Sequence, residues 1–366
     1  MNNNRPWYYE WKQEIDSAVE FIGKCRGHYK LPSAIKNEID AYNELSMFRV
    51  IYESNLLENA GLSESDTKKV ILKTKEQYDT KNFSQLFKKI QKEIGKQSIN
   101  NNRKSDAISF SGRQRSTMEV SKHYSALVLA KAYVFEVELE NFVRGYQSYK
   151  KIISDLKIKG GKNDINTNAK LPNSVLGDIK FNYIWKKGFP ELFNEQEQFI
   201  SEILIKMLHI LMAKDLLPKD AEVRAGFYRI DNRTTDFQTA FPAHENVPKA
   251  MENFIIHSNK LINSDENPVI KAAKISHDFV AIHPFPDFNG RMSRLLMNMV
   301  LLREGLPFLV ALKGNKKEKH KYMNAIRRAN RGKIDRYACL IAIAINNALK
   351  ELNANLEKAG IKPISP

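Results

Sequence analysis

A short connection between two predicted helices gathers residues whose types and spacing fit phosphate chemistry. It covers residues 283–294 and reads HPFPDFNGRMSR. Apolar residues at helical spacing end near Ile282 and start again around Asn289 and Gly290, and two prolines exclude helix between them. A glycine-containing turn that enters a helix presents free backbone N–H groups and the positive end of the helix dipole. We therefore expect this turn to bind phosphate.

Four side chains of this connection could bind or activate the reactants. Arg291 and Arg294 lie three residues apart, so their guanidinium groups could hold phosphate oxygens from one helix face. Asp287 could bind Mg²⁺, which usually takes one or two carboxylates plus substrate phosphates. His283 ends the preceding helix and suits a general base. Alone, each residue could instead be a helix cap or solvated surface, but their order within one connection favours the functional interpretation.

This connection resembles the signature of the Fic family, H-x-F-x-[D/E]-G-N-G-R-x-x-R. The positions that match are His283, Phe285, Asp287, Asn289, Gly290, Arg291 and Arg294. The resemblance implies that His283 deprotonates a hydroxyl group of a target protein. It also implies that Asp287 binds Mg²⁺ at the α- and β-phosphates of ATP.

The remaining positions of the signature have roles in binding and in loop structure. The resemblance implies that Asn289, Gly290 and Arg291 hold the triphosphate, and that Arg294 holds its γ-phosphate. Phe285 corresponds to a buried anchor that fixes the loop, so its implied role is structural.

The sequence departs from the signature at Phe288, where the family has glycine among the residues that approach the nucleotide. Glycine there permits a positive φ and the close approach of a phosphate, and phenylalanine disfavours both. Two outcomes stay open. Either the loop keeps its shape with Phe288 turned away, or the phosphate site is altered and the donor is a compound other than ATP.

A second motif, SNLLEN at residues 54–59, lies far upstream. It resembles the inhibitory helix of the Fic family, [S/T]-x-x-x-E-[G/N], with Ser54 and Glu58 on one helix face and Asn59 suited to end the helix. The resemblance implies that Glu58 pairs with Arg294, so that Arg294 cannot hold the γ-phosphate and ATP binds unproductively. In some relatives the same glutamate promotes the removal of AMP, so that role is open as well.

Residues 225–241 predict a small β-hairpin upstream of the signature. AGFYRI at 225–230 and TAF at 239–241 are short extended candidates around the polar turn 231–235. The segment matches the flap of the Fic family, which pairs with an extended segment of the target by strand addition.

Two more segments extend the resemblance beyond the signature. EVSKHYSAL at residues 119–127 looks like the opening of the Fic core, and YMNAIRRANRG at 322–332 resembles the helix beside the adenine pocket. The second resemblance implies that Tyr322 and Asn330 contact the nucleotide.

Apolar residues recur at helical spacing along most of the chain, so we predict a mostly α-helical protein. With the resemblance, the expected architecture is a Fic-type helical bundle with a small β-hairpin flap and an N-terminal helical region. The expected parts are that region at 1–95 with the inhibitory helix around 54–59, a polar linker at 96–118, the core at 119–350 and a C-terminal tail at 351–366.

Composition limits the classes of protein to which the chain can belong. Hydrophobic residues make up 42% of the 366 residues, as in ordinary globular proteins, and the N-terminus has no apolar signal segment. The two cysteines, far apart, form no metal or disulfide pattern, which favours a cytoplasmic setting. The net charge is +16 with a pI near 9.5, and the densest basic runs are Lys313–Lys321 and Arg327–Lys333. This charge fits a triphosphate or an acidic protein target better than nucleic acid.

We therefore expect an adenylyltransferase that moves AMP from ATP, with Mg²⁺, onto a serine, threonine or tyrosine of a protein target or of itself. Four alternatives stay open: transfer of another phosphate-linked group, a catalytically inactive binding module that retains the fold, a DNA-binding regulator, and a zinc hydrolase that uses His277 and His283. The oligomeric state stays open, with a homodimer as one alternative because relatives often dimerise, and no membrane partner is expected.

Overall fold

The computed structural model describes residues 6–25, 32–77, 111–145, 198–217, 223–234 and 241–364. Within these ranges the protein consists of helices joined by turns and loops, and the elements run in the order α1 (Pro6–Cys25), α2 (Ser33–Leu57), α3 (Glu64–Gln77), α5 (Gly112–Gly145), α9 (Glu202–Ala213), the short η2 (His244–Asn246), α10 (Val247–Ile262), α11 (Pro268–Ile282), α12 (Asn289–Arg303), α13 (Lys316–Ala329) and α14 (Asp335–Lys358). The predicted mostly helical fold is confirmed. None of these helices is long and apolar enough to cross a membrane.

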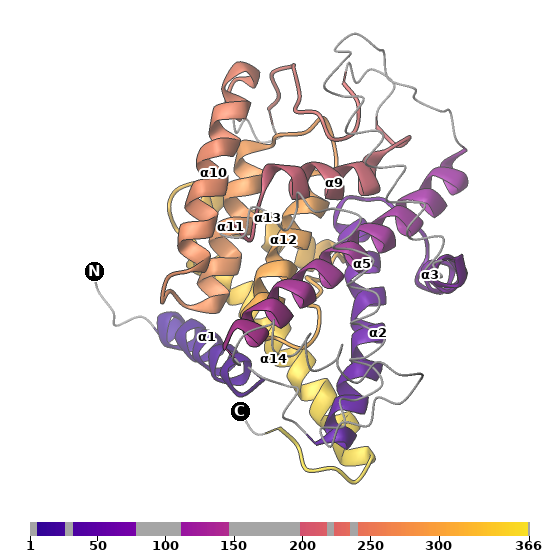
Figure 1. Cartoon of the computed structure of the whole chain (residues 1–366), viewed down its shortest axis with the longest axis vertical. Coiled ribbons are helices and arrows are strands. Elements are labelled where there is room, and N and C mark those ends of the chain that lie inside the picture. The colour runs from indigo at the N-terminus through magenta and orange to yellow at the C-terminus, as the bar shows by residue number, and fades with distance from the viewer. Residues whose placement is uncertain are drawn as a thin grey trace, which may run out of the picture.

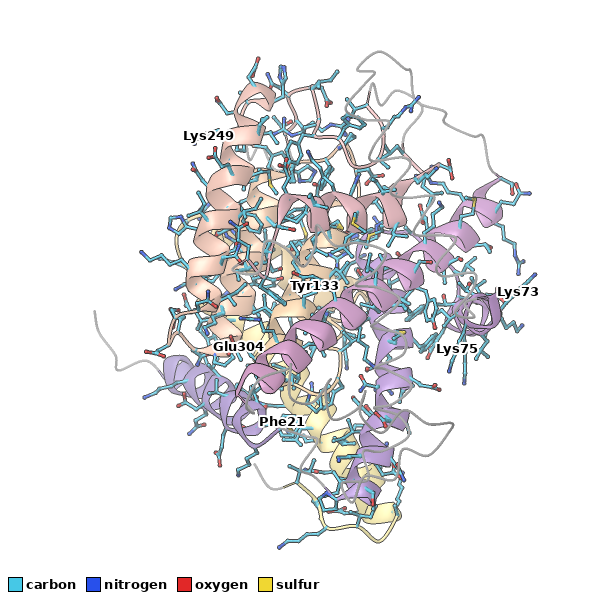
Figure 2. The ribbon with its side chains drawn as sticks, in the orientation of Figure 1. Phe21, Lys73, Lys75, Tyr133, Lys249 and Glu304 are labelled. Carbon is cyan, nitrogen blue, oxygen red and sulfur yellow. The ribbon has the colours of Figure 1, made fainter. Side chains whose placement is uncertain are left out.

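Helix α12 is the centre of the bundle. All its residues from Arg291 to Leu301 are buried, and a helix buried on every side must be surrounded by other elements. Helix α11 packs along it, while α5 and α2 also contact it (Figure 1). A buried ion pair between Lys271 of α11 and Glu304, the residue that follows α12, joins the two central helices at 2.9 Å (Figure 2 labels Glu304). The C-terminal end of α12 is thereby fastened to the start of α11.

The N-terminal helices share this core. The ring of Phe21 in α1, labelled in Figure 2, stacks on Phe308 at 5.8 Å between ring centroids. In α2, the Arg49 guanidinium forms a two-pronged ion pair with Glu351 of α14, and its Nη2 atom lies 2.7 Å from Glu351 Oε1. Helix α2, which contains the predicted inhibitory motif, is therefore fastened to α14 as well as to α5.

Helix α5 begins earlier than the sequence indicates. Residues 112–118, expected to be linker, form its first turns, because Ser111 and Gln114 cap one another. The Gln114 N–H donates to Ser111 Oγ at 3.4 Å, and the Ser111 N–H donates to Gln114 Oε1 at 3.1 Å. Residues 96–110 lie outside the described residues.

Two other expectations differ from the structure at their edges. The predicted tail at 351–366 begins inside α14, which continues to Lys358 because Leu352 and Leu356 are fully buried. The expected hairpin is not present as strands in its described parts. Residues 225–234 form turns with a single bridge residue at Thr234, and residues 235–240 lie outside the description.

Candidate active site

The connection between α11 and α12 has left-handed backbone at both ends. His283, which ends α11, has φ 53°, and Phe288, which precedes α12, has φ 66°. Each such non-glycine residue costs on the order of 1–2 kcal/mol, so the surrounding contacts must hold the loop in place. The loop shape that favours glycine at position 288 is kept in this protein with phenylalanine.

Phe285 anchors the loop as its position in the signature implies. Its ring is fully buried and stacks on the imidazole of His209 at 3.8 Å between centroids. The side-chain amide of Asn289 accepts from the Phe285 N–H at 3.0 Å and donates to the Phe285 carbonyl oxygen at 2.7 Å. Because the Asn289 side chain is used inside the loop, only its backbone N–H is available to a phosphate.

His209, from α9, links three parts of the site. Its Nδ1 accepts the Gly226 N–H at 2.8 Å, so its Nε2–H donates to the Asp287 carbonyl oxygen at 3.2 Å. Burial lowers the pKa of His209 to about 3, which keeps the ring neutral. Sequence reasoning missed this residue, because a histidine within the apolar run of α9 has the same pattern as an ordinary core residue.

The Phe288 ring is buried in the protein, edge-on to the His209 ring at 6.4 Å between centroids. It is only 2% exposed, and the guanidinium of Arg291 lies over it at 3.7 Å. The positive φ of Phe288 and the burial of its ring agree with the first of the two outcomes left open by the sequence, in which the loop keeps its shape.

Arg291 is buried with unused hydrogen-bond donors. Among the described residues its Nε and Nη1 atoms have no hydrogen-bond partner. Its nearest carboxylate oxygens belong to Glu119, at 3.8 Å, and Asp287, at 3.9 Å, both beyond hydrogen-bond length. A buried guanidinium with free donors at a helix N-terminus is suited to receive an anion.

Glu58 and Arg294 meet as the sequence implies. The Arg294 Nη2 atom lies 2.6 Å from Glu58 Oε1, and the same guanidinium donates to the Ser54 hydroxyl at 2.9 Å and to the Ser54 carbonyl oxygen at 3.0 Å. Burial alone would raise the pKa of Glu58, but Arg294 and Arg291 outweigh burial and hold the pKa below its usual value. The Glu58 carboxylate is therefore ionised at neutral pH.

The Glu58 carboxylate lies directly on the first turn of α12. A Cβ atom added to Gly290 would overlap Glu58 Oε1 and lie 3.2 Å from its Cδ. An anion thus occupies the place where the dipole and the free N–H groups of α12 are strongest.

Contacts from Gly314 and Lys319 fix the end of α2. The Gly314 N–H donates to Glu53 Oε2 at 2.7 Å, and a Cβ at Gly314 would come within 2.6 Å of the Glu53 carbonyl oxygen. Lys319 of α13 donates to the Asn59 side chain at 2.9 Å, and Asn59 itself has φ 55°. The sequence gives no signal for Gly314 or Lys319, since both lie in a polar, lysine-rich stretch.

His283 faces the segment that precedes α10. Its ring stacks on Phe241 at 4.1 Å, and its Nδ1 is buried without a hydrogen-bond partner among the described residues. Burial, and then the charge of Arg229, lowers the pKa of His283 to about 4. The imidazole is therefore neutral at physiological pH.

Arg229, which sequence reasoning missed, joins the expected flap to His283 by hydrogen bonds. Its buried guanidinium donates to the carbonyl oxygens of His283 at 2.7 Å, Asp231 at 2.7 Å and Pro242 at 2.5 Å. These bonds place residues 231 and 242, from the two sides of the expected hairpin, beside the connection between α11 and α12.

The two predicted contacts from α13 have different surroundings. The Tyr322 hydroxyl lies 3.4 Å from Arg294 Nη1, so Tyr322 is part of the site. Asn330 is exposed, and its Oδ1 accepts from His277 Nε2 at 2.8 Å. His277 is thus engaged, and no group of three histidine, cysteine or acidic residues among the described ones could hold a metal ion, which leaves the zinc-hydrolase alternative without support.

Asp287 fits the modest demands of a Mg²⁺ ligand. Its Oδ1 accepts the Phe288 N–H at 2.6 Å, which orients the carboxylate, and its side chain is 36% exposed. A single oriented carboxylate beside an anion site matches Mg²⁺, which takes further oxygens from substrate phosphates and water.

Comparison with known proteins agrees with this geometry. The model of the Fic/DOC family matches residues 199–301. Protein adenylyltransferase Fic of Aedes aegypti is 40% identical over 90 residues, which are 24% of this chain and 17% of that protein, so the chain spans less than a fifth of that relative. A probable protein adenylyltransferase of Aquifex aeolicus is 30% identical over 205 residues, 54% of this chain and 60% of that protein.

Solved structures share the fold. A Fic domain containing signaling protein from Bacteroides thetaiotaomicron superposes with a TM-score of 0.56 at 16% identity, covering 96% of this chain and 99% of that one. Fic-1 from C. elegans gives 0.54 at 17% identity, covering 96% and 74%. A Fido domain-containing protein of Dictyostelium discoideum is 33% identical in sequence over 126 residues, 33% of this chain and 86% of that protein. With the family match, this relative shows that the chain belongs to the Fic/DOC family.

Proposed function

We propose that this chain is a protein adenylyltransferase that moves AMP from ATP to a hydroxyl group of a target protein. One observation carries the proposal. The ionised Glu58 lies against Gly290 and Arg294 at the start of α12, where a phosphate would bind, while Arg291 beside it has free donors. His283 stands at the other end of the same loop, so an acceptor hydroxyl and a bound triphosphate would meet there.

The proposed reaction needs one proton acceptor and one leaving group. His283 Nε2 takes the proton of the target hydroxyl while the hydroxyl oxygen forms a bond to the α-phosphorus of ATP. The bond from the α-phosphorus to the oxygen bridging to the β-phosphate then breaks, and pyrophosphate leaves with the electron pair. The charge of the bound triphosphate would raise the pKa of His283 from about 4 toward the working pH, which improves it as a base.

The phosphate groups are assigned to the residues at the start of α12. The backbone N–H groups of Asn289 and Gly290 and the Arg291 side chain would receive the α- and β-phosphates, and Arg294 the γ-phosphate. Asp287 would hold Mg²⁺ together with phosphate oxygens, and the ion would neutralise charge on the leaving pyrophosphate. Tyr322, beside Arg294, would border the nucleotide.

Glu58 acts in this proposal as a built-in inhibitor. Arg294 cannot bind Glu58 and a γ-phosphate at once, because its Nη2 is already 2.6 Å from the carboxylate. With the Glu58 side chain 35% exposed, the pair would be worth on the order of 1–2 kcal/mol, enough to hold the active state to a minority. The same carboxylate could favour the removal of AMP.

The segment around Arg229 would present the target. Bonds from Arg229 to Asp231 and Pro242 hold the described ends of residues 231–242 next to His283, which supports their role as the target-binding flap. The cytoplasmic location and the homodimer stay predictions from the sequence.

The test uses ATP labelled at the α-phosphate or at the γ-phosphate. We expect Glu58→Gly protein to transfer the α-label to itself or to proteins of a cell extract, and His283→Ala in the same background to transfer none. Transfer of the γ-label would identify a phosphotransferase instead. No transfer of either label by folded Glu58→Gly protein would refute the proposal.

A further inference from the structure

A concentrated basic surface lies beside the candidate active site. Residues 313–336, here called the α13 surface, contain ten lysine and arginine residues and two acidic ones, a net charge of +8, half of the +16 of the whole chain. The exposed cations are Lys313, Lys316, Lys317, Lys321, Arg331, Lys333 and Arg336. Within this surface Lys321 pairs with Glu318 at 2.9 Å, and the ten cations outnumber the two acidic residues.

Helix stability does not account for this charge. Lys316 and Lys317 occupy the first turn of α13, where the positive end of the helix dipole disfavours cations. Clustered like charges also repel one another. The helix is instead held by its Asn315 cap, which accepts the Glu318 N–H at 3.1 Å, and by buried Tyr322 and Ala325.

Hydrogen bonds join α13 to the residue that follows Glu58 and to α11. Lys319 near its start bonds Asn59, which follows Glu58, at 2.9 Å. Asn330, just past its end, bonds His277 of α11 at 2.8 Å, and α11 ends at His283. A macromolecule bound to the α13 surface would therefore lie on a helix that contacts the proposed phosphate site, since the Tyr322 hydroxyl lies 3.4 Å from Arg294 Nη1.

The surface has the chemistry for an acidic protein segment rather than for nucleic acid. Tyr322 is the one phenylalanine, tyrosine or tryptophan between 313 and 336, and it is only 6% exposed. The neighbouring half-buried Trp11 ring already faces the Arg336 guanidinium at 5.1 Å, so the described surface offers bases little aromatic area on which to stack. Carboxylate side chains need only charge and donors, which the lysines and arginines supply.

We propose that the α13 surface binds an acidic segment of the protein that this enzyme modifies, and so selects targets with acidic residues near the accepting hydroxyl. The inference rests on the proposed function, because it assumes that the target is a protein. Attraction between opposite charges brings such a target to the site faster and in a preferred orientation.

The test measures binding and labelling of defined peptides by Glu58→Gly protein. The peptides carry serine, threonine or tyrosine flanked by six glutamates or by six glutamines, with a fluorophore for anisotropy. We expect the glutamate peptides to bind about tenfold more tightly at low salt, and the difference to shrink as salt rises to roughly physiological strength.

Charge reversal locates the effect. Lys316→Glu with Lys317→Glu, and separately Arg331→Glu with Lys333→Glu, should remove the preference for glutamate. The matched control, Lys350→Glu with Lys358→Glu, makes the same charge change on exposed residues in the C-terminal half of α14, away from the end that follows α13, and should keep the preference (Figure 1).

Each outcome decides one question. Equal binding of the two peptide types, or an equal loss of the glutamate preference in the α14 control, would overturn the inference. Retained self-labelling in that case would leave the proposed function standing. Tighter binding of a single-stranded oligonucleotide of similar charge, lost in the α13 variants, would assign the surface to nucleic acid instead. A change in the KM for ATP alone would mean that the surface attracts the nucleotide.

Discussion

The carboxylate of Glu58 lies against the Cα atom of Gly290, in space that any side chain at position 290 would have to share. Residues 232 positions apart in sequence thus meet at the first turn of a buried helix. Glycine is required here because of this close approach. The same space would receive a phosphate once Glu58 moves away, which makes the two states mutually exclusive.

The rate of AMP transfer should depend on the charge and the size of the side chain at position 58. Glu58→Gly frees both Arg294 and the first turn of α12, and we expect roughly tenfold faster transfer of AMP, the factor for about 1.4 kcal/mol. Glu58→Gln keeps the size of the side chain but loses its charge, so its rate should fall between those of wild type and Glu58→Gly. Rates of α-label incorporation provide the measurement, and equal rates for wild type and Glu58→Gly would contradict inhibition by Glu58.

Phe288→Gly should destabilise the protein although it removes an unfavourable backbone conformation. Relief at φ 66° is worth about 1 kcal/mol, but loss of a 2%-exposed ring typically costs about 3–5 kcal/mol, so we expect a net loss of roughly 2–4 kcal/mol. Urea unfolding measures it. Asn59→Gly, at φ 55° but with an exposed side chain, is the control and should change stability by less than about 1 kcal/mol. A more stable Phe288→Gly protein would show that the ring contributes little.

Phe288→Gly should also weaken the binding of ATP. The Phe288 ring supports the Arg291 guanidinium at 3.7 Å, and without it Arg291 gains freedom that a bound phosphate must then restrict. We expect the KM for ATP to rise several-fold in Phe288→Gly, measured under conditions in which the protein is folded. An unchanged KM would mean that Arg291 is positioned by other contacts.

His209→Phe tests the link between the flap and the loop. The ring would still stack on Phe285, but the Gly226 N–H and the Asp287 carbonyl oxygen would each lose a partner. We expect a loss of about 1–3 kcal/mol of stability and a lower kcat for transfer, since the loop carrying Asp287 loses its support. If the variant is destabilised while kcat is unchanged, the role of His209 is confined to packing.

Stability should fall in mild acid. His123, His209 and His283 have pKa values lowered to about 3, about 3 and about 4, mainly by burial. In the unfolded chain they bind protons below about pH 6.5, so the unfolded state gains protons that the folded state does not. From pH 7.5 to 5.5 these three groups should remove about 4 kcal/mol of stability.

Unfolding in urea at several pH values measures this loss. His209→Phe should reduce the pH dependence by about a third, whereas the exposed His320→Gln should leave it unchanged. Stability that holds constant down to pH 5.5 would mean that these imidazoles are protonated in the folded protein.

The sequence predicted the parts of the site that lie in continuous motifs. Helical periodicity, the 283–294 connection and the pairing of Glu58 with Arg294 could all be predicted, because spacing or family resemblance carries them. His209 and Arg229 could not, since a histidine in an apolar helix and an arginine in a turn acquire their roles only through distant backbone partners. The predicted start of α5 was wrong, because the mutual cap of Ser111 and Gln114 lies in a stretch whose composition is typical of a loop.

A crystal structure of Glu58→Gly protein with a non-hydrolysable ATP analogue and Mg²⁺ tests the central claim most directly. The account predicts polyphosphate on the first turn of α12, with the terminal phosphate on Arg294 at the place of the Glu58 carboxylate and the α-phosphate beside His283. Phosphates bound elsewhere, or the Phe288 ring filling that turn, would contradict it.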